Sequence, residues 1–484
     1  MHESSSQRHG GLRPGTVGVG GIVVLSAVLM GPAISLFFNA PVMAGNAGAA
    51  VPLVFVLALV GILFTAGSVA QYSRKISTAG SFYGFVQHSA GRRAGFMAGW
   101  ATFGAYLGAA VGGVGITGAF IADLLGRHTG LGIPWIFLSM AVAALVIVIS
   151  VTGLRTSERF SFVMLAIEVV AIIVVVGAVF ARGGADGFSA APFTLAGAEG
   201  ALNGVRLAMV FGVLSFVGFE MSATMAEETR NPRRAVPRAV VGCTLAVGAL
   251  YVLGGYAIVV GYGTEHMDQL ASDHAAFDTL TARYVTSASI VVDLILINAL
   301  LGASLAVSNS FARVAFALGR DRVIPAWFGH AHPRFGTPRN ALLGLGAAVV
   351  IVLAPLAVNG ASGIDAYTYV ATPASLLLIV VFIVANLTLG LLYRRDYRQE
   401  FRWSLHVLTP TLGSLVMLLP ITAQFWPKPP PPLDVLPLFA LGWLAAGVLV
   451  MIVAGRRALR ADGTFAPVEA TVAAAPARED MEDR

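Results

Sequence analysis

Apolar runs of about 20 residues recur from one end of this 484-residue chain to the other. Only 12% of the residues are charged, whereas a soluble domain carries about 25%. Such runs are long enough to cross the hydrocarbon core of a bilayer as helices. Backbone groups in hydrocarbon must bond to one another, so only helices or closed barrels can span it. The ten-residue segments of alternating polarity that are typical of a barrel are not seen. The sequence therefore predicts an all-α polytopic membrane protein, and we expect twelve transmembrane helices.

The basic residues indicate how these helices are oriented. An even number of crossings places both termini on one side, and most of the 31 basic residues then fall on that side. The basic residues left for the other side are Arg127, Arg182, Arg206, Arg283 and Lys428. Because positive residues concentrate in cytoplasmic loops, we expect both termini in the cytoplasm and the protein in the plasma (inner) membrane. Topology thus explains the net charge of +6, and the expected partner is the lipid bilayer, with no nucleic acid.

Two of the predicted spans are interrupted near their centres. In the first, GTVGVGGIVVLSAVLMGPAISLFF, the sequence Met30–Gly31–Pro32–Ala33 breaks the helix, because proline lacks an amide hydrogen and glycine adopts conformations that other residues avoid. A proline kink would explain this break taken alone. The sixth span, however, is interrupted at Val217–Gly218. Interruptions in corresponding spans of two halves indicate a transporter binding site, because unwound backbone is tolerated only beside a cavity.

Three separated stretches resemble the amino acid–polyamine–organocation (APC) superfamily. GFEMSATMAEETRNPRRAVPRA, residues 218–239, is similar to the signature of its sixth span. SRKISTAGSFYGFVQHSAGRRAGFMAGW, residues 73–100, is similar to the region after span two, and NSFARVAFALGRDRVIPAWFGHAHPRFGTPRNA, residues 309–341, to the segment that leaves span eight. The resemblance covers nearly the whole chain. It implies secondary transport of amino acids or related amines by alternating access.

The resemblance also implies how the chain is divided. The expected fold is a LeuT-type 5+5 inverted repeat with discontinuous helices 1 and 6, plus two peripheral helices. The predicted parts are a cytoplasmic tail at 1–16, a first repeat at 17–181, a second repeat at 201–393, the peripheral helices at 403–456 and a disordered cytoplasmic tail at 457–484. We expect a monomer or a homodimer.

Substrate-binding positions follow from the same resemblance. The unwound turn of span one, which binds the substrate carboxylate through backbone amides in the superfamily, falls on Gly31, Pro32 and Ala33. Pro32 has no amide hydrogen, so Ala33 and Ile34 would donate instead. The Leu29 and Met30 carbonyls would lie near the ammonium group. The remaining implied positions are Leu214, Phe216, Val217, Gly218 and Phe219 in span six, with Phe216 or Phe219 as an aromatic lid, and Tyr106, Val307 and Thr372 in spans three, eight and ten.

Two acids within predicted spans are candidates for coupling transport to protons. Glu220 matches an acidic position of many relatives, and it either responds to protons or caps the unwound backbone of span six. Glu168, in MLAIEVVAIIV of span five, either carries a proton or pairs with a polar group in the bundle. A bare carboxylate in hydrocarbon costs on the order of 3 kcal/mol, so both should face the bundle interior. The alternative is a sodium site formed by Ser304 and Ser308 in span eight, but we expect H⁺ rather than Na⁺ as the coupling ion.

The predicted function is secondary active transport of amino acids across the plasma membrane by alternating access, coupled to protons or to exchange. Neutral amino acids are favoured because the implied lining positions carry no charge. A carrier of amines or polyamines on the same scaffold is the alternative, since Pro32 weakens carboxylate recognition. A channel or a non-transporting receptor is a more remote third class. The sequence contains no GxxxxGK[ST], CxxC or HExxH motif and no visible nucleophile–base set, so we expect no enzyme, no cofactor and no metal site.

Overall fold

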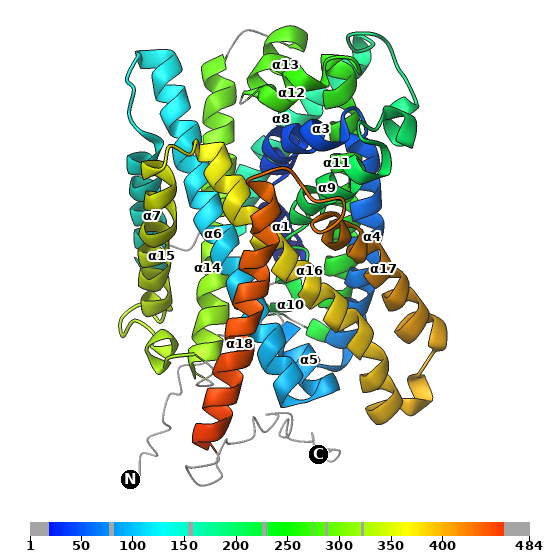
Figure 1. Cartoon of the computed structure of the whole chain (residues 1–484), viewed down its shortest axis with the longest axis vertical. Coiled ribbons are helices and arrows are strands. Elements are labelled where there is room, and N and C mark those ends of the chain that lie inside the picture. The colour runs from blue at the N-terminus through cyan, green and yellow to red at the C-terminus, as the bar shows by residue number, and fades with distance from the viewer. Residues whose placement is uncertain are drawn as a thin grey trace, which may run out of the picture.

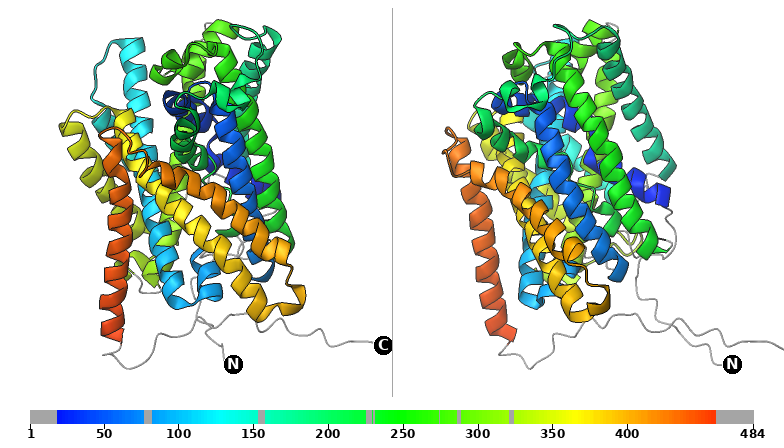
Figure 2. Two further views of the ribbon diagram at one scale, coloured as in Figure 1. Left: turned by 45° about the vertical axis from the view of Figure 1, so that its right-hand side comes forward. Right: turned by 90° about the vertical axis from the view of Figure 1, so that its right-hand side faces the viewer.

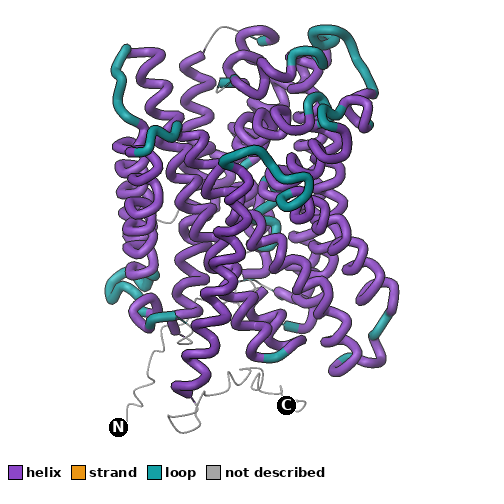
Figure 3. The backbone as a smooth tube through the Cα atoms, in the orientation of Figure 1, coloured by secondary structure: helices purple, strands orange, loops and turns teal. Residues whose placement is uncertain are grey.

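The described residues of the computed structural model form helices joined by loops, without β-strands (Figure 3). These residues are 19–76, 82–152, 158–224, 229, 231–273, 275–285, 289–320 and 324–458. Eleven helical segments among them are long and apolar enough to cross a membrane. A further apolar helix, α9 (Ala201–Leu214), is shorter because the chain unwinds directly after it.

Ten of the long segments consist of one α-helix each, preceded in the last two by a short turn, η7 (Ser404–Leu408) or η8 (Leu433–Val435) (Figure 1). They are α4 (Val51–Lys75), α6 (Arg92–Thr129), α7 (Trp135–Thr152), α8 (Glu158–Ala181), α11 (Pro232–Tyr262), α14 (Ser289–Arg320), α15 (Arg339–Val358), α16 (Gly363–Asp396), α17 (Thr409–Ala423) and α18 (Leu436–Ala458). The apolar windows of α4, α6, α11 and α16 are 56 to 67% buried within the bundle, against 22 to 28% for those of α7, α8, α15 and α18. The first group therefore forms the centre, and the second presents apolar side chains to lipid.

The first long segment is divided into several elements. It consists of α1 (Val19–Met30), α2 (Pro32–Ile34), the π-helical turn η1 (Ser35–Asn39) and α3 (Ala40–Ala47). Gly31, between α1 and α2, has φ 56° and ψ 72°, a left-handed conformation that glycine adopts without steric cost. Pro32 then begins the next helical turn, a position where its missing amide hydrogen is tolerated. Local sequence thus accounts for this interruption.

The second interrupted segment pairs α9 with the short α10 (Met221–Thr224). Residues 215–220 between them form successive turns, held for instance by the bond from the Val217 N–H to the Leu214 carbonyl (3.0 Å). Gly218 has φ +116°, which L side chains rarely adopt. Residues 225–228, which continue the expected sixth span, lie outside the described residues.

The two interruptions pack against each other at the centre of the bundle. A Cβ atom on Gly218 would lie 2.7 Å from Leu29 Cγ and 2.9 Å from the Met30 nitrogen. Beside this contact, the Ser26 and Ser222 hydroxyls are 2.7 Å apart and link α1 to α10. Only a glycine at position 218 lets the two interrupted segments approach this closely.

Short helices mark the two ends of the bundle (Figure 1). At one end lie α12 (Met267–Ser272) and α13 (Ala276–Tyr284), and at the other lies α5 (Phe82–Ala90). We call these the outer and the inner end, following the topology expected from the basic residues. The last helix, α18, runs across the front of the bundle in Figure 1 and along its edge in both views of Figure 2, and it packs on α6 and α16.

Candidate functional site

A cavity of about 70 Å³ lies between the two interrupted helices and the helices that surround them. Its walls are Leu29, Met30, Gly31, Ile34, Ser35 and Asn39 of the first segment, Leu214 and Val217 of the second, Ala109, Gly113 and Ile116 of α6, Ala303, Ser304 and Val307 of α14, and Tyr367 and Ala371 of α16. None of these side chains is charged. Ligand sites commonly enclose about 300 to 1,000 Å³, so the surrounding helices must separate before a substrate can enter.

The carbonyl groups released by the two interruptions are already bonded within the protein. The Tyr251 hydroxyl of α11 lies 2.8 Å from the Met30 carbonyl oxygen and 2.9 Å from that of Ser215. The Ser35 hydroxyl donates to the Met30 carbonyl (3.1 Å) or to Tyr251 Oη (3.0 Å). A buried carbonyl without a partner would be costly, so Tyr251 and Ser35 together stabilise both openings. The Met30 carbonyl, expected near the ammonium group of a substrate, is thus occupied in this conformation.

The first backbone N–H after Pro32, that of Ala33, is bonded to an acid from another helix. The Ala33 N–H donates to Glu168 Oε1 of α8 at 2.6 Å. Glu168 is 5% exposed, and its Oε2 has no hydrogen-bond partner among the described residues. An anion at the start of a helix is stabilised by the exposed amides and the helix dipole. The carboxylate therefore occupies one of the two donors, Ala33 and Ile34, that the sequence assigns to a substrate.

Glu220 has a comparable role at the second interruption. Its Oε2 accepts the Gly218 N–H at 3.0 Å, and its Oε1 accepts the Tyr106 hydroxyl of α6 at 2.5 Å. The side chain is fully buried. These bonds are those of a carboxylate that caps unwound backbone, one of the two roles expected from the sequence. Its response to protons stays a prediction.

The structure brings about half of the sequence-predicted binding residues to the cavity. Those that line it are Leu29, Met30, Gly31, Ile34, Leu214, Val217 and Val307. Those that do not line it are Pro32, Ala33, Tyr106, Phe216, Gly218, Phe219 and Thr372. Of the two aromatic lid candidates, Phe216 packs edge-on against Tyr251 and Phe219 against Phe382, with ring centroids 5.1 and 5.4 Å apart. Neither forms a lid over the cavity in this conformation.

The sequence analysis missed three polar residues of the cavity wall, Ser35, Asn39 and Tyr367. Two of them carry a signal that was available: Gly31, Ser35 and Asn39 are spaced by four, which places them on one helical face. Asn39 donates to the Ser215 hydroxyl (3.0 Å) and accepts from the Tyr367 hydroxyl (3.0 Å). Tyr367 carries no comparable signal, because it stands among other polar residues of α16, such as Asp365 and Thr368.

The two serines considered as sodium ligands differ in their surroundings. Ser304 lines the cavity, and its hydroxyl lies 3.0 Å from that of Thr117. The Ser308 hydroxyl is fully buried and has no hydrogen-bond partner among the described residues. The described residues contain no group of three or more His, Cys, Asp or Glu side chains that could hold a metal ion.

Aromatic contacts hold the outer half of the first segment against the helices beside it. The rings of Phe37 and Phe277 of α13 are tilted by 33° with centroids 4.2 Å apart, and Phe38 meets Phe120 of α6 edge-on at 5.7 Å. Both pairs join the outer half of the first segment to elements beside it. This half of the segment must therefore move, together with its aromatic contacts, before the cavity can open outward.

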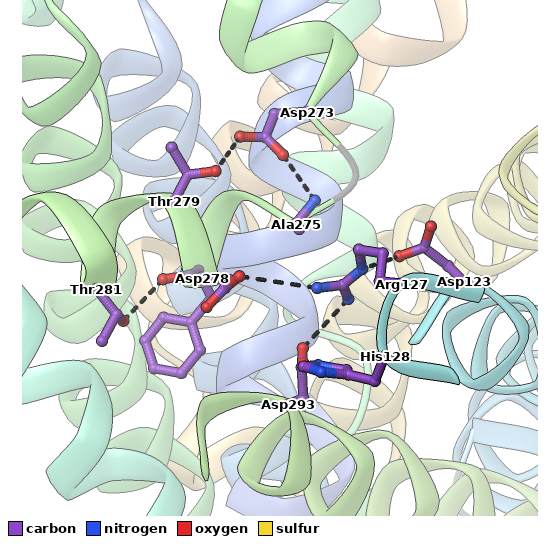
Figure 4. Close-up of polar contacts among 10 residues, drawn as sticks. Asp123, Arg127, His128, Asp273, Ala275, Asp278, Thr279, Thr281 and Asp293 are labelled. Atoms are coloured by element: carbon purple, nitrogen blue, oxygen red, sulfur yellow. Dashed lines mark hydrogen bonds and ion pairs between the residues drawn. The ribbon is translucent and has the colours of Figure 1, made fainter. Parts of the chain in front are cut away.

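A cluster of charged residues lies further toward the outer end (Figure 4). Arg127, near the end of α6, contacts Asp123 (2.8 Å), Asp278 of α13 (3.7 Å) and Asp293 of α14 (3.2 Å). The Asp293 side chain is fully buried and also meets His128 Nε2 at 2.8 Å. Arg127 thus connects α6, α13 and α14 at a single point.

Asp278 should make stability depend on pH. Burial, followed by the nearby Asp293 carboxylate, raises its pKa above the ordinary value, although Arg127 and His128 oppose this shift. The folded protein then binds this proton more tightly than the unfolded chain. The resulting stabilisation is present at low pH and is lost as pH rises from about 3.9, the ordinary aspartate pKa, through the raised value.

We expect Asp278→Asn to remove this part of the pH dependence, because asparagine does not titrate. The measurement is thermal unfolding in detergent across the weakly acidic range, with Asp123→Asn as the control at an exposed member of the same cluster. An unchanged pH profile in Asp278→Asn would show that other groups are responsible.

Comparison with known protein families agrees with this arrangement. The profile described as amino acid permease matches residues 18–453, which include both interrupted segments and the cavity. The chain belongs to the amino acid permease family. It is accordingly a multi-pass membrane transporter, as its long apolar helices require, and the names of its relatives are those of permeases and transporters rather than enzymes.

Several characterised relatives of this permease are about equally distant. It is 27% identical over 342 residues to the low-affinity putrescine importer PlaP of Escherichia coli (strain K12), covering 69% of this chain and 73% of the relative. It is also 27% identical over 337 residues to the branched-chain amino acid permease BcaP of Bacillus subtilis (strain 168), covering 64% and 69%. Identity to the chloroplastic cationic amino acid transporter 6 of Arabidopsis thaliana is again 27%, over 62% of this chain and 54% of that one.

Proposed function

We propose that this permease is a secondary active transporter that carries a small molecule with an amino group, an amino acid or an amine, across the plasma membrane by alternating access. The observation that carries this proposal is the contact between two interrupted helices beside a small cavity that both of them line. Interrupted helices that meet near the midplane form the substrate site in transporters of this type. These two segments supply half of the residues that line the cavity.

The small size of the cavity supports alternating access. A cavity of about 70 Å³ is too small to serve as a continuous conducting path, and the ring contacts of Phe37 and Phe38 hold the outer half of the first segment in place beside it. Movement of the outer half of the first segment would expose it on one side. Separation of α1 from α10, which the Ser26–Ser222 contact now joins, would expose it on the other.

The names of the relatives cover both candidate substrate classes. One relative imports putrescine and another carries branched-chain amino acids. The uncharged cavity wall supports a neutral amino acid, as the sequence predicted, whereas the bond between Glu168 and Ala33 supports an amine. Coupling to protons or to exchange is part of this proposal, with Glu220 and Glu168 as the candidate groups.

Transport by purified protein in liposomes tests the proposed function. Labelled amino acids and their decarboxylated amines are offered, with or without the same compound unlabelled inside. We expect saturable uptake that is accelerated by internal substrate, because exchange requires a site that faces each side in turn. Non-saturating flux would indicate a channel, and the absence of uptake and binding for both classes would overturn the proposal.

A further inference from the structure

The Ala33 amide, which a substrate carboxylate would need, is held by the protein's own carboxylate. Gly31 is not a substitute donor, because its N–H is bonded to the Ala27 and Val28 carbonyls, both at 3.2 Å. Pro32 has no N–H. Ala33 is thus the first donor of the broken turn, and Glu168 Oε1 accepts its hydrogen bond at 2.6 Å.

A second carboxylate could not share this position without cost. Glu168 is almost completely buried, and its only hydrogen bond in the described structure is the one from Ala33. Like charges a few ångströms apart in a site of low dielectric repel strongly. An amino acid bound with its carboxylate at Ala33 would therefore have to displace Glu168 or leave it protonated.

The charged residues near the cavity also favour a cationic substrate. Neither Glu168 nor Glu220 lines the cavity, and neither contacts a basic side chain among the described residues. The walls themselves carry no Lys, Arg or His. Their polar atoms come from Ser35, Asn39, Ser304 and Tyr367, groups that accept hydrogen bonds from an ammonium. Two buried carboxylates without a basic partner near an uncharged cavity favour a cation there.

We propose that Glu168 makes this site selective for a cation without a carboxylate, a small primary amine or diamine. The inference rests on the proposed transport function and names the substrate class for the same cavity. An amino acid is disfavoured because its carboxylate meets an occupied amide and no cationic side chain. Glu168 is the specificity-determining residue, since its removal frees the Ala33 N–H.

Matched pairs that differ only by a carboxylate provide the test. Affinities of the purified full-length protein in detergent are measured by calorimetry for putrescine against ornithine and for 3-methylbutylamine against leucine. For whichever pair the unmodified protein binds, we expect the amine to bind at least about tenfold more tightly than the amino acid. In Glu168→Ala the freed amide should accept the carboxylate, so this ratio should fall by about tenfold.

Two further variants separate charge, blocking and folding. Glu168→Gln retains an oxygen that can accept the Ala33 N–H, so we expect it to lose amine affinity without gaining the amino acid. Should Glu168→Ala not fold, this loss of amine affinity tests the proposal by itself. Glu400→Gln is the matched control, because Glu400 lies at the inner end with Lys75 as its partner (2.6 Å). Both affinities should be unchanged in this control.

Each outcome decides a different point. The role of Glu168 would be overturned if the unmodified protein bound the amino acid more tightly than the amine. It would also be overturned if the ratio of amine to amino acid affinity were unchanged in Glu168→Ala and the amine affinity were unchanged in Glu168→Gln. Either result would leave the transport function intact. Failure of all amines and amino acids to bind would overturn the transport function itself, and the inference with it.

Discussion

Replacing Gly218 with leucine should abolish substrate binding while leaving the helical bundle folded. The new Cβ atom would lie 2.8 Å from Leu29 Cβ and 2.9 Å from the Met30 nitrogen, far inside normal contact distances. The residue would also have to keep φ +116°. Strained backbone and overpacking each cost about 1 to 3 kcal/mol. Moving the two interruptions apart relieves this strain, and that movement destroys the cavity.

The expected loss of affinity for Gly218→Leu is at least about tenfold, because tenfold requires only about 1.4 kcal/mol. Calorimetry with the ligand found in the transport assay measures it, and thermal unfolding reports whether the bundle is intact. Gly242→Leu is a matched control: Gly242 lies on the exposed face of α11, where an added Cβ meets no atom within 4 Å. Unchanged affinity in a folded Gly218→Leu would show that substrate binds elsewhere.

Replacing Arg127 with alanine should destabilise the protein more than any other change in the charged cluster at the outer end. Asp293 is fully buried and has Arg127 and His128 as partners. Removing one partner of a buried ion pair costs about 3 to 5 kcal/mol. Because Arg127 is 31% exposed and His128 stays in place, we expect a smaller loss, about 2 to 3 kcal/mol in the free energy of unfolding.

Unfolding of the purified protein in detergent measures this loss, with Asp123→Ala as the control. Asp123 is 45% exposed, so its removal should change the free energy by less than about 0.5 kcal/mol. Adding Asp293→Asn to Arg127→Ala should restore part of the stability, because the buried charge that lacks its partner is then removed. A loss in Arg127→Ala no larger than in Asp123→Ala would show that Arg127 does not hold α6, α13 and α14 together.

Much of the fold was predictable because it depends on local properties of the chain. Long apolar runs form helices in a membrane whatever their neighbours are. Gly31–Pro32 and Gly218 interrupt their helices through their own backbone preferences. The short α9 and the turns that follow it are a consequence of the same preference, so that a single long span does not form there.

The candidate site was less predictable, because the face that each residue presents depends on how its helix is rotated in the bundle. Phe216 and Phe219 belong to the expected segment, yet they pack on Tyr251 and Phe382 and not over the cavity. Tyr106 contacts Glu220 and does not line the cavity, whereas Ala109 and Gly113 of the same helix line it. Residues three or four apart share one helical face, so Tyr106 differs from Ala109 in its depth along the helix axis and not in the face that it presents.

The sequence by itself determined the helical membrane architecture, the two interruptions and the presence of two acids within apolar segments. Only the tertiary structure decided what those acids do. Glu168 and Ala33 are 135 residues apart, and Glu220 and Tyr106 are separated by 114. Backbone preferences and hydrophobicity act over a few residues, so they specify where a helix breaks. The partner of a buried carboxylate is set by the packing of distant helices, and this packing placed Glu168 on the amide that the sequence had assigned to a substrate.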